Sequence, residues 1–113
     1  MPTMTQATHA YASAANHRSQ RQQDADVFRR ATGALKVARD QGPLPRVRAI
    51  ADNRRLWIVV CDLMRDPSNP LPQDMRAAIV SIGLAVQREM DGNSPDFDFL
   101  IAINENIAAG LSG

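Results

Sequence analysis

The stretch that most constrains this chain is residues 46–64, RVRAIADNRRLWIVVCDLM, which holds the only tryptophan, Trp57, and the only cysteine, Cys61. Successive side chains of an α-helix are about 100° apart, so each one can be placed on the helix barrel. From Leu56 to Met64 the side chains are apolar in almost every direction. A helix of this kind is buried by neighbours on several sides. The stretch therefore predicts a small helical domain with this helix at its centre.

Proline, glycine and capping residues divide the rest of the chain into further helices. The expected boundaries are Asp24 or Asp26, Gly42-Pro43, Pro45, residues 66–70, Pro72, residues 91–93, and Ser94 as the N-cap of a last helix. No stretch shows the alternation of apolar residues that is typical of a strand. We therefore predict an all-α protein, one domain over residues 1–113, with four or five helices and short loops.

The N-terminal segment is expected to form a weakly held helix. Residues 5–17 place small apolar side chains at helical spacing, and Tyr11 is the only large one among them. A helix of this length is marginal alone in water, so residues 1–20 are predicted to dock loosely. The polar residues 18–24 are either a break or a continuous, exposed helix.

Three further apolar stripes are predicted to face the core. They consist of Val27, Phe28, Ala31, Ala34, Leu35 and Ala38; of Met75, Ala78, Ile79, Ile82, Ala85, Val86 and Met90; and of Phe99, Leu100, Ile103, Ile107 and Leu111, with Phe97, Ile101 and Ala108 beside them. Val80 and Leu84 lie four residues apart on the same helix as the second stripe, on the side opposite to it. This side of the helix is either covered by another helix or available to a partner.

The charge is unevenly distributed, although the net charge is only +1. Residues 1–55 carry ten Lys/Arg against four Asp/Glu, whereas residues 56–113 carry three against eight. Such asymmetry can mark a nucleic-acid surface. The favoured interpretation is that the two halves attract each other across solvated faces, because the basic half lacks interleaved aromatics and a dense cation cluster.

Catalysis is not expected. His9 and His17 have no cysteine or carboxylate neighbours at zinc-ligand spacing, and Cys61 lies among apolar residues, where it is expected to be a small core hydrophobe. There is no glycine-rich phosphate loop. We therefore expect no catalytic residues, no metal and no cofactor. The chain also lacks a signal peptide and an apolar run of transmembrane length, and one cysteine suits a reducing setting, so a cytoplasmic location is expected.

Two polar residues fall inside apolar arcs. Arg54 projects between the directions of Ile50 and Cys61, and burying an unpaired guanidinium is prohibitive, so it should find a carboxylate or carbonyls. Glu89 is one candidate partner. Asn104 lies between apolar positions of the last helix. Arg54 and Asn104 either form polar pairs that fix the register of the helices or line a groove that receives another chain's helix. Arg55, in contrast, should face water.

Asn53-Arg54-Arg55-Leu56-Trp57, together with two further motifs in the same order, resembles the NRRLW signature of the flagellar biosynthesis regulator FlaF family. The remaining matches are Asn69-Pro70-Leu71-Pro72 with Arg76-Ala77-Ala78-Ile79-Val80-Ser81, then Leu100-Ile101-Ala102-Ile103-Asn104 with Ile107 and Gly110-Leu111, and Ala10-Tyr11 near the N-terminus. Ala85-Val86 departs from the family, which often has an aromatic residue there. The resemblance covers nearly the whole chain.

The resemblance implies a cytoplasmic protein that serves flagellin production and export beside a second regulator, FlbT, which controls translation of flagellin mRNA. It implies a flagellin-specific secretion chaperone that holds the terminal helices of unpolymerised flagellin. We expect flagellin to dock beneath the N-terminal helix that carries Tyr11, or alternatively on Val80 and Leu84. Direct RNA binding by the basic half is the competing function class, and membrane binding is not expected.

Overall fold

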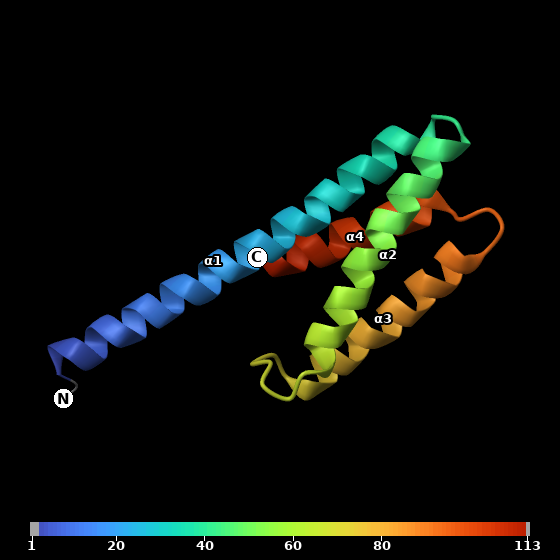
Figure 1. The fold of residues 1–113 in the computed structure, drawn as a ribbon. Coiled ribbons are helices and arrows are strands. Elements are labelled where there is room, and N and C mark those ends of the chain that lie inside the picture. The colour runs from blue at the N-terminus through green and yellow to red at the C-terminus, as the bar shows by residue number, and fades with distance from the viewer. Residues whose placement is uncertain (1–2, 113) are drawn as a thin grey trace.

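The computed structural model describes residues 3–112, and its side chains are described for residues 3–6, 8 and 20–111. Four helices make up this part of the chain: α1 (Met4–Arg39), α2 (Pro43–Arg65), α3 (Gln73–Asp91) and α4 (Phe97–Ser112). Short loops join them, and residues 3–112 contain no strand (Figure 1). The predicted all-α class is therefore confirmed.

The first helix is longer than the sequence pattern predicts, because it runs without a break from Met4 to Arg39. A capping box starts it: the Gln6 N–H donates to Thr3 Oγ1 (3.1 Å) and the Thr3 N–H donates to Gln6 Oε1 (2.9 Å). Since residues 18–24 contain neither glycine nor proline, nothing interrupts the backbone hydrogen bonds there. The expected start at Asp24 or Asp26 is thus wrong, and the continuous alternative holds, with residues 20–23 exposed.

The N-terminal half of α1 extends past the ends of the other three helices (Figure 1). At a rise of 1.5 Å per residue, 36 residues span about 54 Å, which accounts for most of the molecule's 61 Å long dimension. The side chain of Tyr11 lies outside the described residues, so its expected anchoring role stays a prediction.

The other helix ends follow the predicted punctuation with one exception. Ser94 does not cap α4; instead Asp96 Oδ1 accepts a hydrogen bond from the Phe99 N–H (3.1 Å). Glu89 is the reason why the cap lies two residues after Ser94. Its Oε1 accepts a hydrogen bond from the Asp96 N–H (2.8 Å), and this bond holds Asp96 in the capping position.

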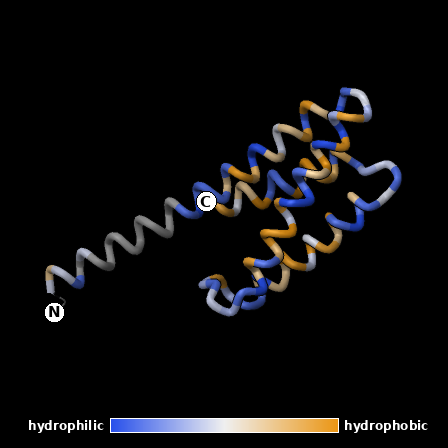
Figure 2. Tube along the Cα trace, viewed as in Figure 1, coloured by the Kyte–Doolittle hydropathy of each residue, from blue (hydrophilic) through white to orange (hydrophobic). Residues whose placement is uncertain are grey.

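The core lies where the four helices meet, and Trp57 is fully buried within it. The rings of Phe28 and Trp57 pack edge to face with their centroids 5.6 Å apart. Hydrophobic residues gather between the helices, whereas the loops are largely hydrophilic (Figure 2). The buried core cluster consists of Phe28, Leu35, Ala38, Ala49, Trp57, Val60, Val86, Met90, Phe97, Leu100, Ile101 and Ala108.

The central helix is not buried on all sides, which contradicts the sequence-based expectation. Ile58, Val59 and Leu63 are 46%, 55% and 47% exposed. The physical reason is that α1 and α3 flank α2 and α4 reaches it from behind, while no further helix covers its outer side (Figure 1). The surplus of apolar residues on α2 therefore lies at the surface.

The predicted stripes on the other helices are partly right. On α3 the core contacts come from Ile79, Ile82, Val86 and Met90, while Met75, Ala78 and Ala85 are exposed. The stripes of α1 and α4 are displaced, because Val27 and Phe99 are exposed whereas Thr32 and Asn104 are buried. Thr32 is tolerated inside because its Oγ1 donates to the Phe28 carbonyl (2.6 Å).

Ion pairs join the basic and acidic halves of the chain. Lys36–Glu105 (3.6 Å), Arg39–Asp98 (2.7 Å) and Arg54–Asp91 (2.5 Å) each connect a cation before residue 56 to a carboxylate after it. Because the charges are largely exposed to water, each such surface pair contributes little to folding. Their arrangement agrees with the interpretation that the two halves attract each other.

Cys61 is a core residue, as its sequence context predicts. It is 2% exposed, and burial raises the pKa of its thiol, with Asp62 adding to this shift and Arg65 opposing it. A buried thiol is protonated and inaccessible, so iodoacetamide at pH 8 should alkylate Cys61 at least about 100-fold more slowly in the native protein than in 8 M urea. Alkylation at a rate near that of free cysteine would contradict this packing.

Candidate functional site

An apolar groove lies between α1 and α2. The two helices diverge from their shared turn, so the space between them widens toward the loop that joins α2 to α3 (Figure 1). Three hollows follow this space, with volumes of about 400, 140 and 440 Å³. Adjacent hollows share lining residues: Val27, Leu56 and Val59 for the first two, and Asp24, Leu63, Met64 and Leu111 for the last two. They therefore form one continuous groove.

Aliphatic side chains dominate the lining of the groove. Val27 on α1 and Val59 and Leu63 on α2 are 44%, 55% and 47% exposed. Contiguous exposed apolar surface of this kind is typical of a site that binds another protein. The half-buried floor consists of Leu56, Met64, Leu71, Ile79, Ile107 and Leu111.

A fixed loop closes the wide end of the groove. Asn69 Nδ2 donates to the Leu63 carbonyl (2.9 Å), and Asn69 Oδ1 accepts from the Leu71 N–H (3.0 Å). Arg76 donates from Nε to the Leu71 carbonyl (3.1 Å) and from Nη1 to the carbonyls of Met64 and Asp66 (both 3.2 Å). Three of these bonds go to carbonyls at the C-terminal end of α2, those of Leu63, Met64 and Asp66. The remaining two hold Leu71 in place in the floor of the groove, at its wide end.

Buried amides connect the helices behind the groove. Trp57 Nε1 donates to Asn104 Oδ1 (2.9 Å), and Asn104 Nδ2 donates to Asn53 Oδ1 (2.7 Å). Asn53 Nδ2 then contacts Met90 Sδ (3.4 Å). Asn53 and Asn104 are fully buried, so this network links α2, α3 and α4 in one register. Asn104 thus joins helices and does not line the groove, and the sequence pattern gave no sign that Asn53 is its partner.

Arg54 is paired and Arg55 faces water, as predicted, but the partner of Arg54 is Asp91 instead of Glu89, and the pair lies at the surface and not inside the bundle, with side chains that are 35% and 66% exposed. Arg54 Nη1 donates to Asp91 Oδ1 (2.5 Å) and Nη2 donates to the Met90 carbonyl (3.4 Å). Glu89 is occupied by the loop that precedes α4. Arg55 is 74% exposed at the side chain and pairs with Asp52 (2.8 Å).

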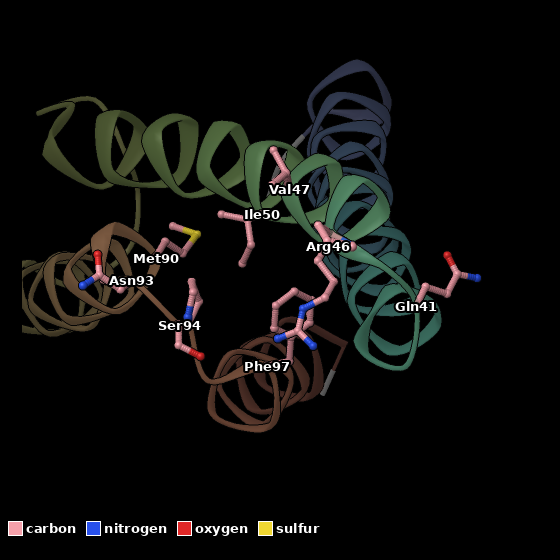
Figure 3. Close-up of a pocket in the computed structure, with 11 residues that line it drawn as sticks. Gln41, Arg46, Val47, Ile50, Met90, Asn93, Ser94 and Phe97 are labelled. Carbon is pink, nitrogen blue, oxygen red and sulfur yellow. The ribbon is translucent and has the colours of Figure 1, made fainter.

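A separate hollow, of about 600 Å³, lies at the opposite end of the bundle (Figure 3). The guanidinium of Arg46 lies 4.6 Å from the centroid of the Phe97 ring, and its Nη1 donates to the Arg39 carbonyl (3.1 Å). Gln41 points away from the hollow (Figure 3). Since Arg46 is used to join the end of α1 to the first turn of α4, we assign this region a structural role.

Two of the predicted partner-binding residues, Val80 and Leu84, lie together on α3 but outside the groove, and the side chain of Tyr11 lies outside the described residues. Val80 is half-buried and Leu84 is 45% exposed, but both lie on α3 and neither lines the groove. Val60 and Met64, which belong to the apolar stretch that we expected to be buried, do line it. Sequence reasoning missed Val27, Val59 and Leu63 because it placed them in the core. The signal was present in the surplus of apolar directions on α2.

The described residues show no arrangement for a metal ion, since no three His, Cys, Asp or Glu side chains among them are grouped to hold one. His9 and His17 lie outside the described side chains. None of the helices in this part of the chain has the length and apolar content needed to cross a membrane.

The fold and the groove define the class: a small all-α protein that presents an apolar, helix-lined surface. Residues 7–111 match the family model of the flagellar protein FlaF. This chain belongs to the FlaF family and is therefore a flagellar protein. No curated protein and no solved structure matches it.

Proposed function

We propose that this protein is a cytoplasmic chaperone that binds a terminal helix of unpolymerised flagellin in the groove between α1 and α2. The observation that carries the proposal is the continuous apolar groove, with Val27, Val59 and Leu63 about half exposed along it. An amphipathic helix lying with its apolar face in a hydrophobic groove is a common mode of peptide recognition. The protein would act by binding, without catalysing a reaction.

The dimensions of the groove support a helical partner. Its α1 wall runs from Gln20 to Ala34, which corresponds to about 21 Å at 1.5 Å per residue. That length accommodates about four turns of a helix, or about 14 residues. Three hollows in series provide places for apolar side chains from successive turns.

Binding of this kind would couple flagellin export to flagellin synthesis. A chaperone that is filled by unexported flagellin differs from an empty one in the surface that it offers to other proteins. The second regulator, FlbT, would then act on flagellin mRNA according to the supply of empty chaperone.

Direct binding to flagellin mRNA is the competing proposal, and the excess of cations in residues 1–55 favours it. Three of those cations, Lys36, Arg39 and Arg54, already pair with carboxylates of the second half. This pairing reduces the charge available for phosphates. Affinity for RNA would fall steeply with salt, whereas binding of a helix in an apolar groove would change little.

The test replaces Val59 and Leu63 together by aspartate. The double variant should bind purified monomeric flagellin at least about 30-fold more weakly, because two apolar contacts are lost and two carboxylates are desolvated. Isothermal titration calorimetry measures the affinity. Because Val59 and Leu63 are about half exposed, the helices should persist in the variant, and far-UV circular dichroism checks this.

The matched control is Val80→Asp with Leu84→Asp, an equal change on α3 away from the groove. Its flagellin affinity should stay within about threefold of the unmodified protein. If this control loses affinity while the Val59/Leu63 variant keeps it, flagellin docks on α3. If neither variant changes affinity for flagellin, and binding of flagellin mRNA falls steeply with salt, the RNA proposal replaces this one.

A further inference from the structure

The outward face of α3 is exposed to solvent along most of the helix. α3 lies at the edge of the bundle and packs mainly against α2 (Figure 1). Seven exposed residues of α3 fall within an arc of about 120°, at 100° per residue. They are Asp74, Ala77, Ala78, Ser81, Leu84, Ala85 and Arg88. The groove takes only Ile79 from α3, so this outward face is a separate surface.

The middle of the outward face is suited to close packing against another helix. It consists of three alanines and Ser81, with Leu84 beside them at 45% exposure. Side chains of this size let two helix axes approach to about 8 Å. Asp74, Ser81 and Arg88 are spaced by seven residues, which is the repeat of helices that pair along a shared seam.

The charges at the two ends of the outward face are opposite. Asp74 lies in the first turn of α3 and Arg88 in the last turn, about 21 Å apart along the helix axis. Among the residues that the structure describes, neither belongs to an ion pair. Asp74 Oδ1 accepts a hydrogen bond from the Met75 N–H (2.9 Å). The outward face is therefore complementary in charge to a second copy of itself that runs in the opposite direction.

We propose that two copies of this chain form a dimer through the outward faces of their α3 helices, packed antiparallel about a twofold axis at Ser81. Asp74 then lies opposite the partner's Arg88, once on each side of the axis. The other pairs are apolar: Ala77 with the partner's Ala85, and Ala78 with the partner's Leu84.

The antiparallel direction follows from the charges. Parallel packing would place Asp74 beside the partner's Asp74 and Arg88 beside the partner's Arg88, and like charges placed together are disfavoured. A twofold interface uses the same patch on both chains, so the outward face alone completes it. This inference goes beyond the proposed function and does not depend on it, because the groove stays open in the dimer.

The first test is the mass of the full chain in solution as a function of its concentration. One pair of helices is small beside the roughly 1,200–2,000 Å² of a standard protein interface. The dimer should therefore be weak, with a Kd of about 10–100 µM. Sedimentation velocity between about 1 and 500 µM should show a monomer that becomes a dimer. A chain that stays monomeric at 500 µM would overturn the inference, and the flagellin titration of the Val80/Leu84 variant would then show whether this face serves flagellin instead.

Charge reversal with rescue tests the pairing of Asp74 with Arg88. Asp74→Arg places two cations together at each end of the interface, and Arg88→Asp places two carboxylates together there. Each single variant should dimerise at least about tenfold more weakly than the unmodified chain. An equimolar mixture of the two variants restores opposite charges at both ends, so mixed dimers should form. Because each variant must be folded to take part, recovery in the mixture also excludes misfolding as the cause of the loss.

Two controls separate this pairing from an effect of net charge. Asp74→Arg combined with Arg88→Asp in one chain keeps the net charge and should recover dimerisation to within about threefold. Arg48→Asp makes the same charge change as Arg88→Asp at an exposed position of α2 and should leave dimerisation unchanged. If the single variants dimerise as tightly as the unmodified chain, or if Val59→Asp with Leu63→Asp abolishes the dimer instead, the copies pair through another surface and the inference is wrong.

Discussion

Replacing Asn104 by leucine is expected to lower the free energy of unfolding by about 2–5 kcal/mol, although leucine is similar in shape and apolar. Asn104 accepts from Trp57 Nε1 and donates to Asn53 Oδ1, and all three residues are fully buried. The substitution leaves one donor and one acceptor without partners, and each costs about 1–3 kcal/mol. Urea denaturation followed by far-UV circular dichroism measures the change.

The control for this prediction is a double-mutant cycle. Asn53→Leu together with Asn104→Leu removes both amides, so only the Trp57 N–H is left unpaired and the cost should be smaller than the sum of the single changes. The coupling energy should be about 1–3 kcal/mol. Additive effects, or a loss below 1 kcal/mol for Asn104→Leu, would mean that the amides do not act as one network.

Replacing Gly83 by alanine is expected to destabilise the protein by about 1–3 kcal/mol. A Cβ at this position would lie 2.5 Å from Cys61 Sγ and 3.2 Å from Trp57 Cε3, so α2 and α3 would have to move apart. This cost exceeds the gain of about 1 kcal/mol that alanine brings to a helix interior. The measurement is the midpoint and slope of urea unfolding.

Two variants show whether close approach of the helices is the cause. Gly33→Ala places the same methyl group in α1, where nothing lies within 4 Å, and should stabilise the protein by about 0.5–1 kcal/mol. Gly83→Ala combined with Cys61→Ala removes the Sγ atom that the new methyl group meets, and should recover most of the lost stability. No recovery in the combined variant would place the strain elsewhere.

Helix boundaries were predictable from sequence wherever a single residue type determines them. The proline and glycine residues around positions 42–45, 66–72 and 91–93 end or begin helices as expected, because proline lacks an N–H and glycine suits helix ends. The cap of α4 was not predictable, because Asp96 is placed by Glu89 from another helix. The length of α1 was underestimated because its exposed, polar residues 20–23 have no stripe to mark them.

The groove was harder to predict than the fold. Periodicity shows that a side of a helix is apolar but not how many neighbours cover it, so Val59 and Leu63 were placed inside the core. Periodicity could not predict the amide network either. Asn104 stood out because it interrupts an apolar stripe, but its partner Asn53 is 51 residues away in the chain. Only the packing of α2 against α4 brings the two together.

The position of Trp57 gives this protein an optical reporter that is separate from its surface. It is the only tryptophan of the chain, it is fully buried, and its indole nitrogen donates to an amide oxygen. Its emission spectrum will therefore respond to opening of the core. Since Trp57 does not line the groove, a helix that binds there does not contact the indole itself. Unfolding and ligand occupancy can thus be followed in one sample, with intrinsic fluorescence for the first and a labelled partner for the second.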